Sequence, residues 1–161
     1  MTIAYLGLGG NLGDRETSLQ QAAEALDWGP ARLLRSSRLY ETEPIGGPED
    51  QPWFLNQVVE IETRMQPGEL LDRCMAIENA LGRRRANEAR WGPRIIDIDV
   101  LLFGDLELNT GGLIIPHPRL FERAFALVPL AELAPDLVPP GRSQTVAELA
   151  AAIDDQAVRP L

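Results

Sequence analysis

The sequence predicts an α+β fold, a ferredoxin-like βαββαβ core in which helices pack on one face of an antiparallel sheet. Up to residue 103, apolar runs and amphipathic stretches follow in the order strand, helix, strand, strand, helix, strand. A chain of 161 residues can bury about 70% of its unfolded surface in one core. Because no repeat or low-complexity linker divides it, we expect residues 1–161 to form a single domain.

Three strands are marked by apolar residues in the first half of the chain. A short run that ends in glycines predicts a buried strand over residues 3–8, and further runs predict strands over 32–41 and 54–63. Three Pro and two Gly between residues 44 and 52 predict a loop.

Two helices have clear boundaries and buried faces. Asp14 is a suitable cap for a helix over residues 15–27, and Gly29-Pro30 ends it. Pro67 opens the second helix and Gly82 closes it. Apolar residues at helical spacing predict the buried stripes, which are Leu19, Ala22, Ala23 and Leu26 in the first helix and Leu70, Cys74, Ile77 and Leu81 in the second.

The second half of the chain begins with a polar, Arg-rich loop over residues 83–93. Alternation then predicts a strand over 94–103, and Gly104-Asp105 predicts a two-residue hairpin turn into a strand over 106–108. The remaining elements that we expect are a short strand over 113–115, a helix over 123–134 that is bent or restarted at Pro129, and a helix over 145–153 opened by the capping box of Thr145 and Glu148.

Charge and composition exclude several classes of protein. A net charge of −9 argues against a general binder of nucleic acid or anionic membranes. No apolar run approaches the roughly 18 residues of a membrane span, and the first ten residues lack the features of an export signal. The single Cys74 excludes an intrachain disulfide framework. We therefore expect a cytoplasmic protein.

The basic residues are all arginine and are unevenly distributed. Residues 83–123 hold seven Arg against six acids, whereas the rest of the chain holds eight Arg against eighteen acids. Without lysine, neither a Walker-type phosphate site nor a Schiff-base mechanism is possible. The planar guanidinium group suits phosphate oxygens, so the Arg-rich stretch is a candidate site.

Two acids on the predicted strand 94–103 form the strongest local motif. Residues two apart on a strand lie about 6.6 Å apart and point to the same face. Asp97 and Asp99 therefore project together, and Mg²⁺, which prefers hard oxygen ligands, can neutralise such a pair. An isolated D-x-D motif more often lines the wetted face of a strand, but five Arg in the twelve residues 83–94 favour a metal-bound polyphosphate.

Two further motifs have both a functional and a structural interpretation. His117, the only histidine, stands between two prolines and can donate a hydrogen bond near phosphates, although a lone His is more often a plain polar residue. Phe54 and Asn56 share one face of their strand, where an aromatic ring can stack on a planar heterocycle and an amide can bind its edge. Phe125 can cover the other side of that ring, although aromatic residues of this kind more often belong to the core.

Together these motifs resemble those of one enzyme family, the hydroxymethyl-dihydropterin pyrophosphokinases of folate biosynthesis. The resemblance extends from residue 4 to about residue 141. It rests on Y-E-T-E-P-I-G-G-P-E-D-Q-P-W-F-L-N at 40–56, W-G-P-R-x-x-D-x-D at 91–99 and P-H-P-R at 116–119. That family transfers the pyrophosphoryl group of ATP to the hydroxymethyl group of a reduced pterin and releases AMP.

The resemblance implies the ligands and the site residues. It implies ATP as co-substrate, two Mg²⁺ ions, a reduced pterin as the other partner and a monomer that binds neither nucleic acid nor membranes. The metal residues are Asp97 and Asp99, which are catalytic together with Arg83 and Arg94. The ATP-binding residues are Glu78, Arg85, Arg90, Trp91, Ile98, His117 and Arg123, with Trp91 on a loop that closes over the site. The pterin-binding residues are Thr42, Pro44, Ile45, Phe54, Asn56 and Phe125, and the two Phe rings enclose the pterin.

Three other classes of protein remain as alternatives. A non-catalytic small-molecule-binding domain of the same fold explains the sheet and pocket but not the acids beside five Arg. An RNA-binding sheet requires a basic face and aromatic stacking residues in the RNP pattern, which the chain lacks. A metal-dependent phosphohydrolase releases phosphate or pyrophosphate without a pterin.

Overall fold

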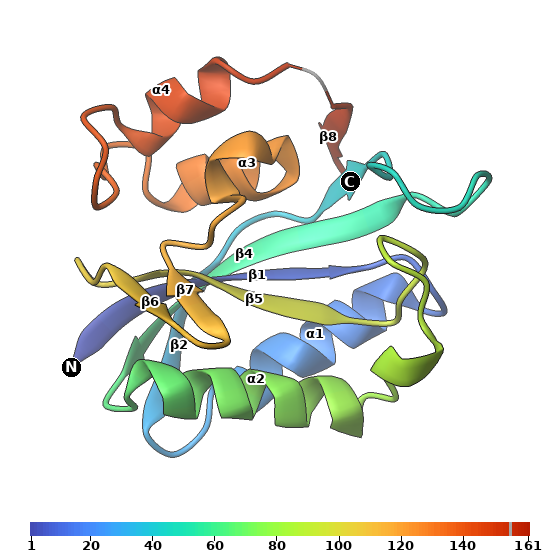
Figure 1. Cartoon of the computed structure of the whole chain (residues 1–161), viewed down its shortest axis with the longest axis horizontal. Coiled ribbons are helices and arrows are strands. Elements are labelled where there is room, and N and C mark those ends of the chain that lie inside the picture. The colour runs from blue at the N-terminus through green and yellow to red at the C-terminus, as the bar shows by residue number, and fades with distance from the viewer. Residues whose placement is uncertain (155) are drawn as a thin grey trace.

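The computed structural model describes residues 1–154 and 156–161. Strands and helices are mixed along the chain (Figure 1). In chain order, the elements are β1 (Thr2–Gly10), α1 (Arg15–Leu26), β2 (Ala31–Ser36), β3 (Tyr40–Thr42), β4 (Phe54–Thr63), α2 (Pro67–Ala80), the short 3-10 helix η1 (Arg85–Asn87), β5 (Asp97–Phe103), β6 (Leu108–Thr110), β7 (Leu113–Ile115), a second 3-10 helix η2 (Leu120–Glu122), α3 (Ala124–Leu133), α4 (Val146–Ala151) and β8 (Val158–Pro160).

The main sheet confirms the expected ferredoxin-like order. Its strands run β5-β1-β4-β3-β8, and β2 also pairs with β4, so that β2 and β3 together take the place of the second strand of the core. All of these pairings are antiparallel. Helices α1 and α2 cover one face of the sheet, as expected, but α3 and α4 cover part of the opposite face (Figure 1). The one-face arrangement expected for the helices of the βαββαβ core is therefore confirmed, and α3 and α4 are additions to that core.

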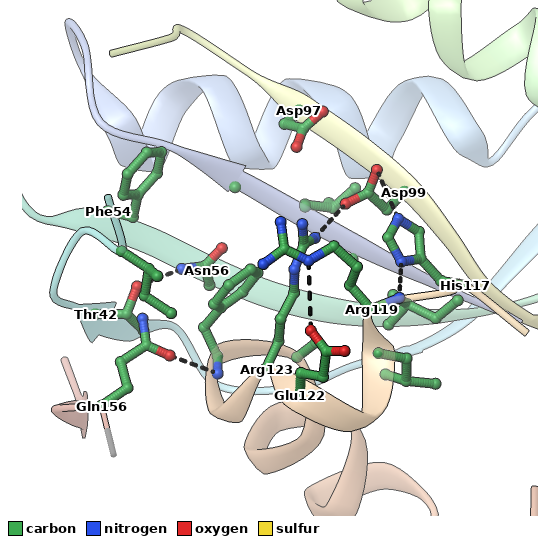
Figure 2. Close-up of a pocket in the computed structure, with 18 of the residues that line it drawn as sticks. Thr42, Phe54, Asn56, Asp97, Asp99, His117, Arg119, Glu122, Arg123 and Gln156 are labelled. Atoms are coloured by element: carbon green, nitrogen blue, oxygen red, sulfur yellow. Dashed lines mark hydrogen bonds and ion pairs between the residues drawn. The ribbon is translucent and has the colours of Figure 1, made fainter. Parts of the chain in front are cut away.

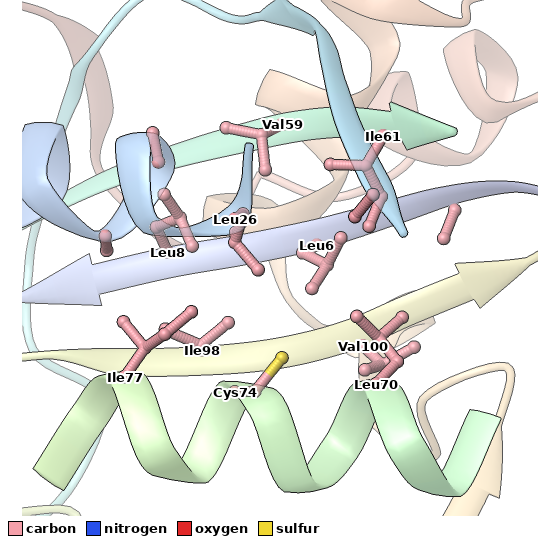
Figure 3. Packing of buried hydrophobic residues seen from close by; sticks show 14 of the residues in the cluster. Leu6, Leu8, Leu26, Val59, Ile61, Leu70, Cys74, Ile77, Ile98 and Val100 are labelled. Atoms are coloured by element: carbon pink, nitrogen blue, oxygen red, sulfur yellow. The ribbon is translucent and has the colours of Figure 1, made fainter. Parts of the chain in front are cut away.

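Two hydrophobic clusters hold these layers together. The larger one lies between the sheet and helices α1 and α2, where Leu6 and Leu8 of β1 meet Cys74 and Ile77 of α2 (Figure 3). The second joins the other sheet face to α3 and α4, and Leu127 is fully buried in it. Strand β5 contributes to both clusters. Ile98 and Val100 belong to the larger cluster, and Leu101 belongs to the cluster beneath α3 and α4.

The two main helices follow the sequence closely. Asp14 caps α1 by accepting a hydrogen bond from the Thr17 N–H at 3.1 Å, and the four expected stripe residues are buried. In α2 the stripe differs at one position, because Leu81 is only half-buried while Glu78 is buried. A carboxylate is stable there because it has three hydrogen-bond donors, which are described with the site below.

Several predicted strand boundaries are wrong. The expected strand over 32–41 is interrupted, because Ser37 bonds to Val58 through both its N–H and its hydroxyl and so leaves the regular ladder. The strand expected from residue 94 starts at Asp97. The turn at Gly104-Asp105 exists, but it forms no hairpin with β5, since β6 pairs with β7 instead.

The last part of the chain adds features that local patterns predict poorly. Helix α3 continues through Pro129 without a restart, and α4 has the expected capping box but ends at Ala151. Strand β8 was not expected, and it pairs with the edge strand β3. Over the residues that the model describes, no helix has the length and apolar character needed to cross a bilayer.

Candidate active site

A cavity of about 300 Å³ opens on the sheet face that carries α3, beyond the N-terminal end of that helix. Its floor is formed by β1, β4 and β5, and one wall by the segment 117–126 (Figure 2). Trp91 also lines the cavity. Gly9 belongs to this floor, and a Cβ there would collide with the side-chain oxygen of Asn56. The glycine-rich start of the chain therefore makes room for a pocket side chain.

Asp97 and Asp99 point from β5 into this cavity, as expected from their alternation (Figure 2). Asp97 accepts a hydrogen bond from Arg83 at 2.7 Å, and Arg94 lies 3.5 Å from its other oxygen. Asp99 lies 3.6 Å from Arg123 and 3.8 Å from His117. The structure thus brings two acids together with three guanidinium groups and one imidazole.

The environment separates the acidities of these two carboxyl groups. Burial and the neighbouring charge of Asp97 raise the pKa of Asp99 to about 7. Burial also opposes ionisation of Asp97, but the Arg83 guanidinium outweighs that effect and lowers its pKa. The cavity therefore holds one firmly ionised carboxylate and a second that gains its charge near neutral pH.

His117 is neutral at pH 7, because burial and the positive charge of Arg123 lower its pKa to about 4. Its Nδ1 accepts a hydrogen bond from the Arg119 N–H at 3.2 Å. The ring proton of the neutral imidazole consequently lies on Nε2, the atom that faces Asp99. His117 is placed to donate a hydrogen bond at the acid pair.

Arg83 lies deeper than the expected polar loop implies, with only 5% of its side chain exposed. It donates to Glu88 through two nitrogens, to Glu78 at 2.9 Å and to Asp97. Glu78 also accepts from Arg85 at 2.7 Å and from the N–H of Ile98 at 2.8 Å. Burial raises the pKa of Glu78, while these donors hold the carboxylate in one orientation.

Two loops meet above the cavity. The ring of Trp91 packs on Gly46, and the Gln51 side chain donates to the carbonyls of Gly46 and Trp91 at 3.1 Å each. Trp91 has a φ of 56°, a left-handed conformation that is unusual for a bulky residue. The guanidinium groups of Arg90 and Arg119 lie 4.6 and 5.2 Å from the centre of its ring.

The other end of the cavity is aromatic and polar. Asn56 donates to the Thr42 hydroxyl at 2.6 Å, and both side chains are buried. Phe54 and Phe125 line the same end, and Arg94 and Arg123 lie over their rings at 5.4 and 5.2 Å. The cavity is also lined by Ile45, whereas Pro44 is not among its lining residues.

A second, apolar hollow adjoins the acids on the side of β7. It contacts Asp99 and His117 and is lined mainly by Leu71, Ile98, Leu113 and Ile114. Ile98 therefore lies beside the main cavity and not inside it.

Several lining residues were missed by the sequence analysis, and three of the polar ones are Arg119, Glu122 and Gln156. Arg119 and Glu122 lie across the cavity from the acids and approach each other at 3.5 Å (Figure 2). Arg119 belongs to the P-H-P-R motif, so its position could have been inferred from the motif. Gln156 lines the cavity from the far end of the chain, and no local sequence pattern indicates it.

Asp97 and Asp99 fit a divalent metal in chemistry and geometry. They supply hard oxygen ligands on one face, and since burial and the charge of Asp97 raise the pKa of Asp99, a cation there would favour its ionised form. Among the described residues, no group of three or more His, Cys, Asp or Glu side chains can hold a metal ion. Magnesium suits a site of two carboxylates, because water and substrate phosphates complete its coordination.

The fold and this cavity define a ferredoxin-like α+β protein whose acidic and arginine-rich site suits a polyphosphate. A family model described as 7,8-dihydro-6-hydroxymethylpterin-pyrophosphokinase matches residues 5–135. The chain belongs to this family.

Curated relatives and solved structures agree with this assignment. The chain is 49% identical over 159 residues to a 2-amino-4-hydroxy-6-hydroxymethyldihydropteridine pyrophosphokinase of Methylorubrum extorquens, covering 98% of each chain. It is 52% identical to the protein of that name from Bacillus subtilis, covering 81% of this chain and 77% of the relative. A crystal structure of Plasmodium falciparum HPPK-DHPS shares the fold, with a TM-score of 0.70 and 19% identity over 94% of this chain and 43% of the longer one.

Proposed function

We propose that this protein transfers the terminal pyrophosphoryl group of ATP to the hydroxymethyl group of 6-hydroxymethyl-7,8-dihydropterin in folate biosynthesis and releases AMP. One observation carries the proposal. The same cavity presents two strand carboxylates among guanidinium groups at one end and two Phe rings with a buried amide at the other. A polyphosphate and a planar heterocycle can therefore lie end to end.

Asp97 and Asp99 would hold two Mg²⁺ ions together with the triphosphate. When bound, the ions neutralise phosphate oxygens and lower the cost of charge on the leaving group. Arg94 and Arg123 flank the two carboxylates and would compensate the charge of the remaining phosphate oxygens, while the buried Arg83 holds Asp97 in place. Because Arg94 and Arg123 also lie over the two Phe rings, they stand where the two substrates meet.

The reaction needs no protein nucleophile. The pterin hydroxyl oxygen forms a bond to the β-phosphorus, the bond from that phosphorus to the oxygen of AMP breaks, and the hydroxyl proton is released. The residues contribute alignment and charge compensation, which are the main sources of catalysis in phosphoryl transfer. We assign no general base, since His117 Nδ1 already accepts a hydrogen bond from the Arg119 N–H and its Nε2 carries the proton that faces Asp99.

The pterin would lie between Phe54 and Phe125, with Asn56 and Thr42 at its polar edge. The Asn56 amide has hydrogen-bonding capacity beyond its bond to Thr42, so it can donate to and accept from a ring edge. Ile45 closes the apolar side, and Pro44 supports the turn of that loop.

The nucleotide would extend from the acids over the apolar hollow beside Ile98. His117 contacts both spaces, Glu78 orients Arg83 and Arg85, and Arg90 stacks on Trp91. The contact between Trp91 and the loop over 44–52 supports closure of both loops to exclude water from ATP.

The decisive experiment identifies the nucleotide product. Purified protein is incubated with ATP, Mg²⁺ and the reduced pterin, and we expect AMP only when the pterin is present. ADP would indicate ordinary kinase chemistry, and phosphate or pyrophosphate without pterin would indicate a hydrolase. Binding of both compounds without turnover would support the alternative of a non-catalytic small-molecule-binding domain. An Asp97→Asn variant should remain folded and lose turnover by several orders of magnitude.

The same proposal includes a monomer that acts as one domain over residues 1–161, in the cytoplasm and without nucleic acid or membrane partners. The net charge of −9 supports the last point, and the use of ATP and the lone buried thiol support the location.

A further inference from the structure

Helix α3 begins at the cavity without a cap from its own N-cap residue. Arg123 holds that position, and its side chain makes no capping hydrogen bond. It lies 3.6 Å from Asp99 instead. A guanidinium group has donors only, so it cannot accept a hydrogen bond from the first N–H groups of the helix. The site therefore requires at this position a residue that leaves the helix uncapped.

Gln156 supplies an acceptor from 31 residues further along the chain. Its side-chain oxygen accepts a hydrogen bond from the N–H of Phe125, the second residue of α3, at 3.1 Å. Its side-chain nitrogen donates to the carbonyl of Glu43 at 2.8 Å. Glu43 directly follows Thr42, so one buried amide links both walls of the aromatic end of the cavity (Figure 2).

The main chain around Gln156 reinforces this link. The N–H of Glu43 donates to the Ala157 carbonyl at 3.1 Å, and the N–H of Ala157 donates to the Glu43 carboxylate at 2.8 Å. Strand β8 then continues the pairing along β3. The Gln156 side chain is thus fixed on both sides, and the spacing of the walls depends on its length and on its two polar atoms.

We propose that Gln156 is a positioning residue for the pterin end of the site, which sets the distance of Phe125 from Thr42 and Asn56. This inference rests on the proposed function. The C-terminal segment is accordingly part of the substrate site and not only an added edge strand.

Three substitutions separate the two hydrogen bonds. Gln156→Met keeps the approximate shape and removes both bonds. Gln156→Glu keeps the acceptor for Phe125 and loses the donor to Glu43. Gln156→Asn keeps the amide, but it is one methylene too short to reach both walls. Arg159→Met is the matched control, since Arg159 ties β8 to Glu41 and Trp53 on the surface and does not line the cavity.

The experiment measures the KM for the reduced pterin at saturating MgATP and the KM for ATP at saturating pterin, with the melting temperature of each variant. Q156M should raise the pterin KM about tenfold while the ATP KM stays within twofold, because the phosphate residues lie on other elements. Q156E should show a smaller rise, Q156N should resemble Q156M, and R159M should leave both KM values unchanged.

The outcomes distinguish this inference from the proposed function. If the parent protein forms no AMP, the proposed function fails. If the parent is active and Q156M or Q156E binds pterin as the parent does, the positioning role is wrong. If Q156M does not fold, Q156E and Q156N decide the question. Equal changes in both KM values, or the same changes in R159M, would indicate general loosening and also overturn the inference.

Discussion

Asp99 is a candidate metal ligand, and its buried negative charge destabilises the folded protein. Its pKa is raised to about 7 from an ordinary value of 3.8, so between pH 4 and 7 the folded state binds more protons than the unfolded state. Stability therefore falls as pH rises through this range. His117 opposes this trend, because its lowered pKa makes stability rise between about pH 4 and 6.5.

Replacing Asp99 should raise the melting temperature at high pH and at the same time abolish turnover. In magnesium-free buffer, Asp99→Asn should melt at the temperature of the parent near pH 4 and a few degrees higher at pH 8, since the uncompensated charge is gone. The same variant should lose almost all turnover. Melting curves across the pH range test this, with Asp105→Asn on the exposed turn as control. A variant that is less stable than the parent at pH 8 would contradict the electrostatic account.

Arg94 should contribute mainly to the rate. It lies near both Asp97 and the Phe54 ring, and under the proposed function we expect it to contact phosphate more strongly as charge develops during transfer. Arg94→Ala should lower kcat about 100- to 1,000-fold with smaller changes in both KM values. Arg84→Ala is the control, because Arg84 donates only to main-chain carbonyls of Asn79 and Arg83. A change confined to KM would show that the assigned role is wrong.

At the scale of elements, the two loops above the cavity depend on a close approach of main chains. Gly47 has a φ of +75°, and a Cβ there would collide with the Trp91 carbonyl. Gly47→Ala should therefore separate the loops and lower kcat about tenfold or more, with little loss of melting temperature because both loops are exposed. Gly111→Ala is the matched control, since a Cβ at Gly111 meets nothing within 4 Å. Unchanged kcat in Gly47→Ala would show that contact between the loops is not needed for turnover.

Elements with strong local patterns were predicted well. The Asp14 cap, the Pro67 start, the strand over 54–63 and the alternation of Asp97 and Asp99 with Ile98 and Val100 are properties of short segments, and each was confirmed. The break at Ser37 and the pairing of β6 with β7 depend on partners elsewhere in the chain. Sequence patterns alone do not contain that information.

In the candidate site, too, the residues in local motifs were predicted and those placed by long-range contacts were not. Asp97, Asp99 and their arginines lie close in sequence or in a recognisable motif, and the structure brings them together. The burial of Glu78 and Arg83 follows from their mutual ion pair, and Gln156 reaches the cavity through β8. Such long-range contacts are decided by tertiary packing, which no local pattern predicts.

At the scale of the whole molecule, the sheet is stabilised from both faces. Leu127 is completely buried in the α3 and α4 layer, away from the larger cluster. Leu127→Ala should lower the free energy of unfolding by about 2–5 kcal/mol, as expected for a large buried residue. Urea unfolding followed by circular dichroism measures this, with the exposed Val138→Ala expected to change it by less than about 0.5 kcal/mol. A loss below about 1 kcal/mol would show that the second layer contributes little.

The lone thiol of Cys74 has a practical consequence. It is fully buried beneath the sheet, and burial raises its pKa to about 12, so it rarely forms the reactive thiolate. Two cysteines introduced together at Glu49 and Ala86, exposed positions in the two loops, would then be the fast-reacting positions for maleimide dyes. Distances between dyes, and hence the opening of the loops during turnover, become measurable in the otherwise native chain.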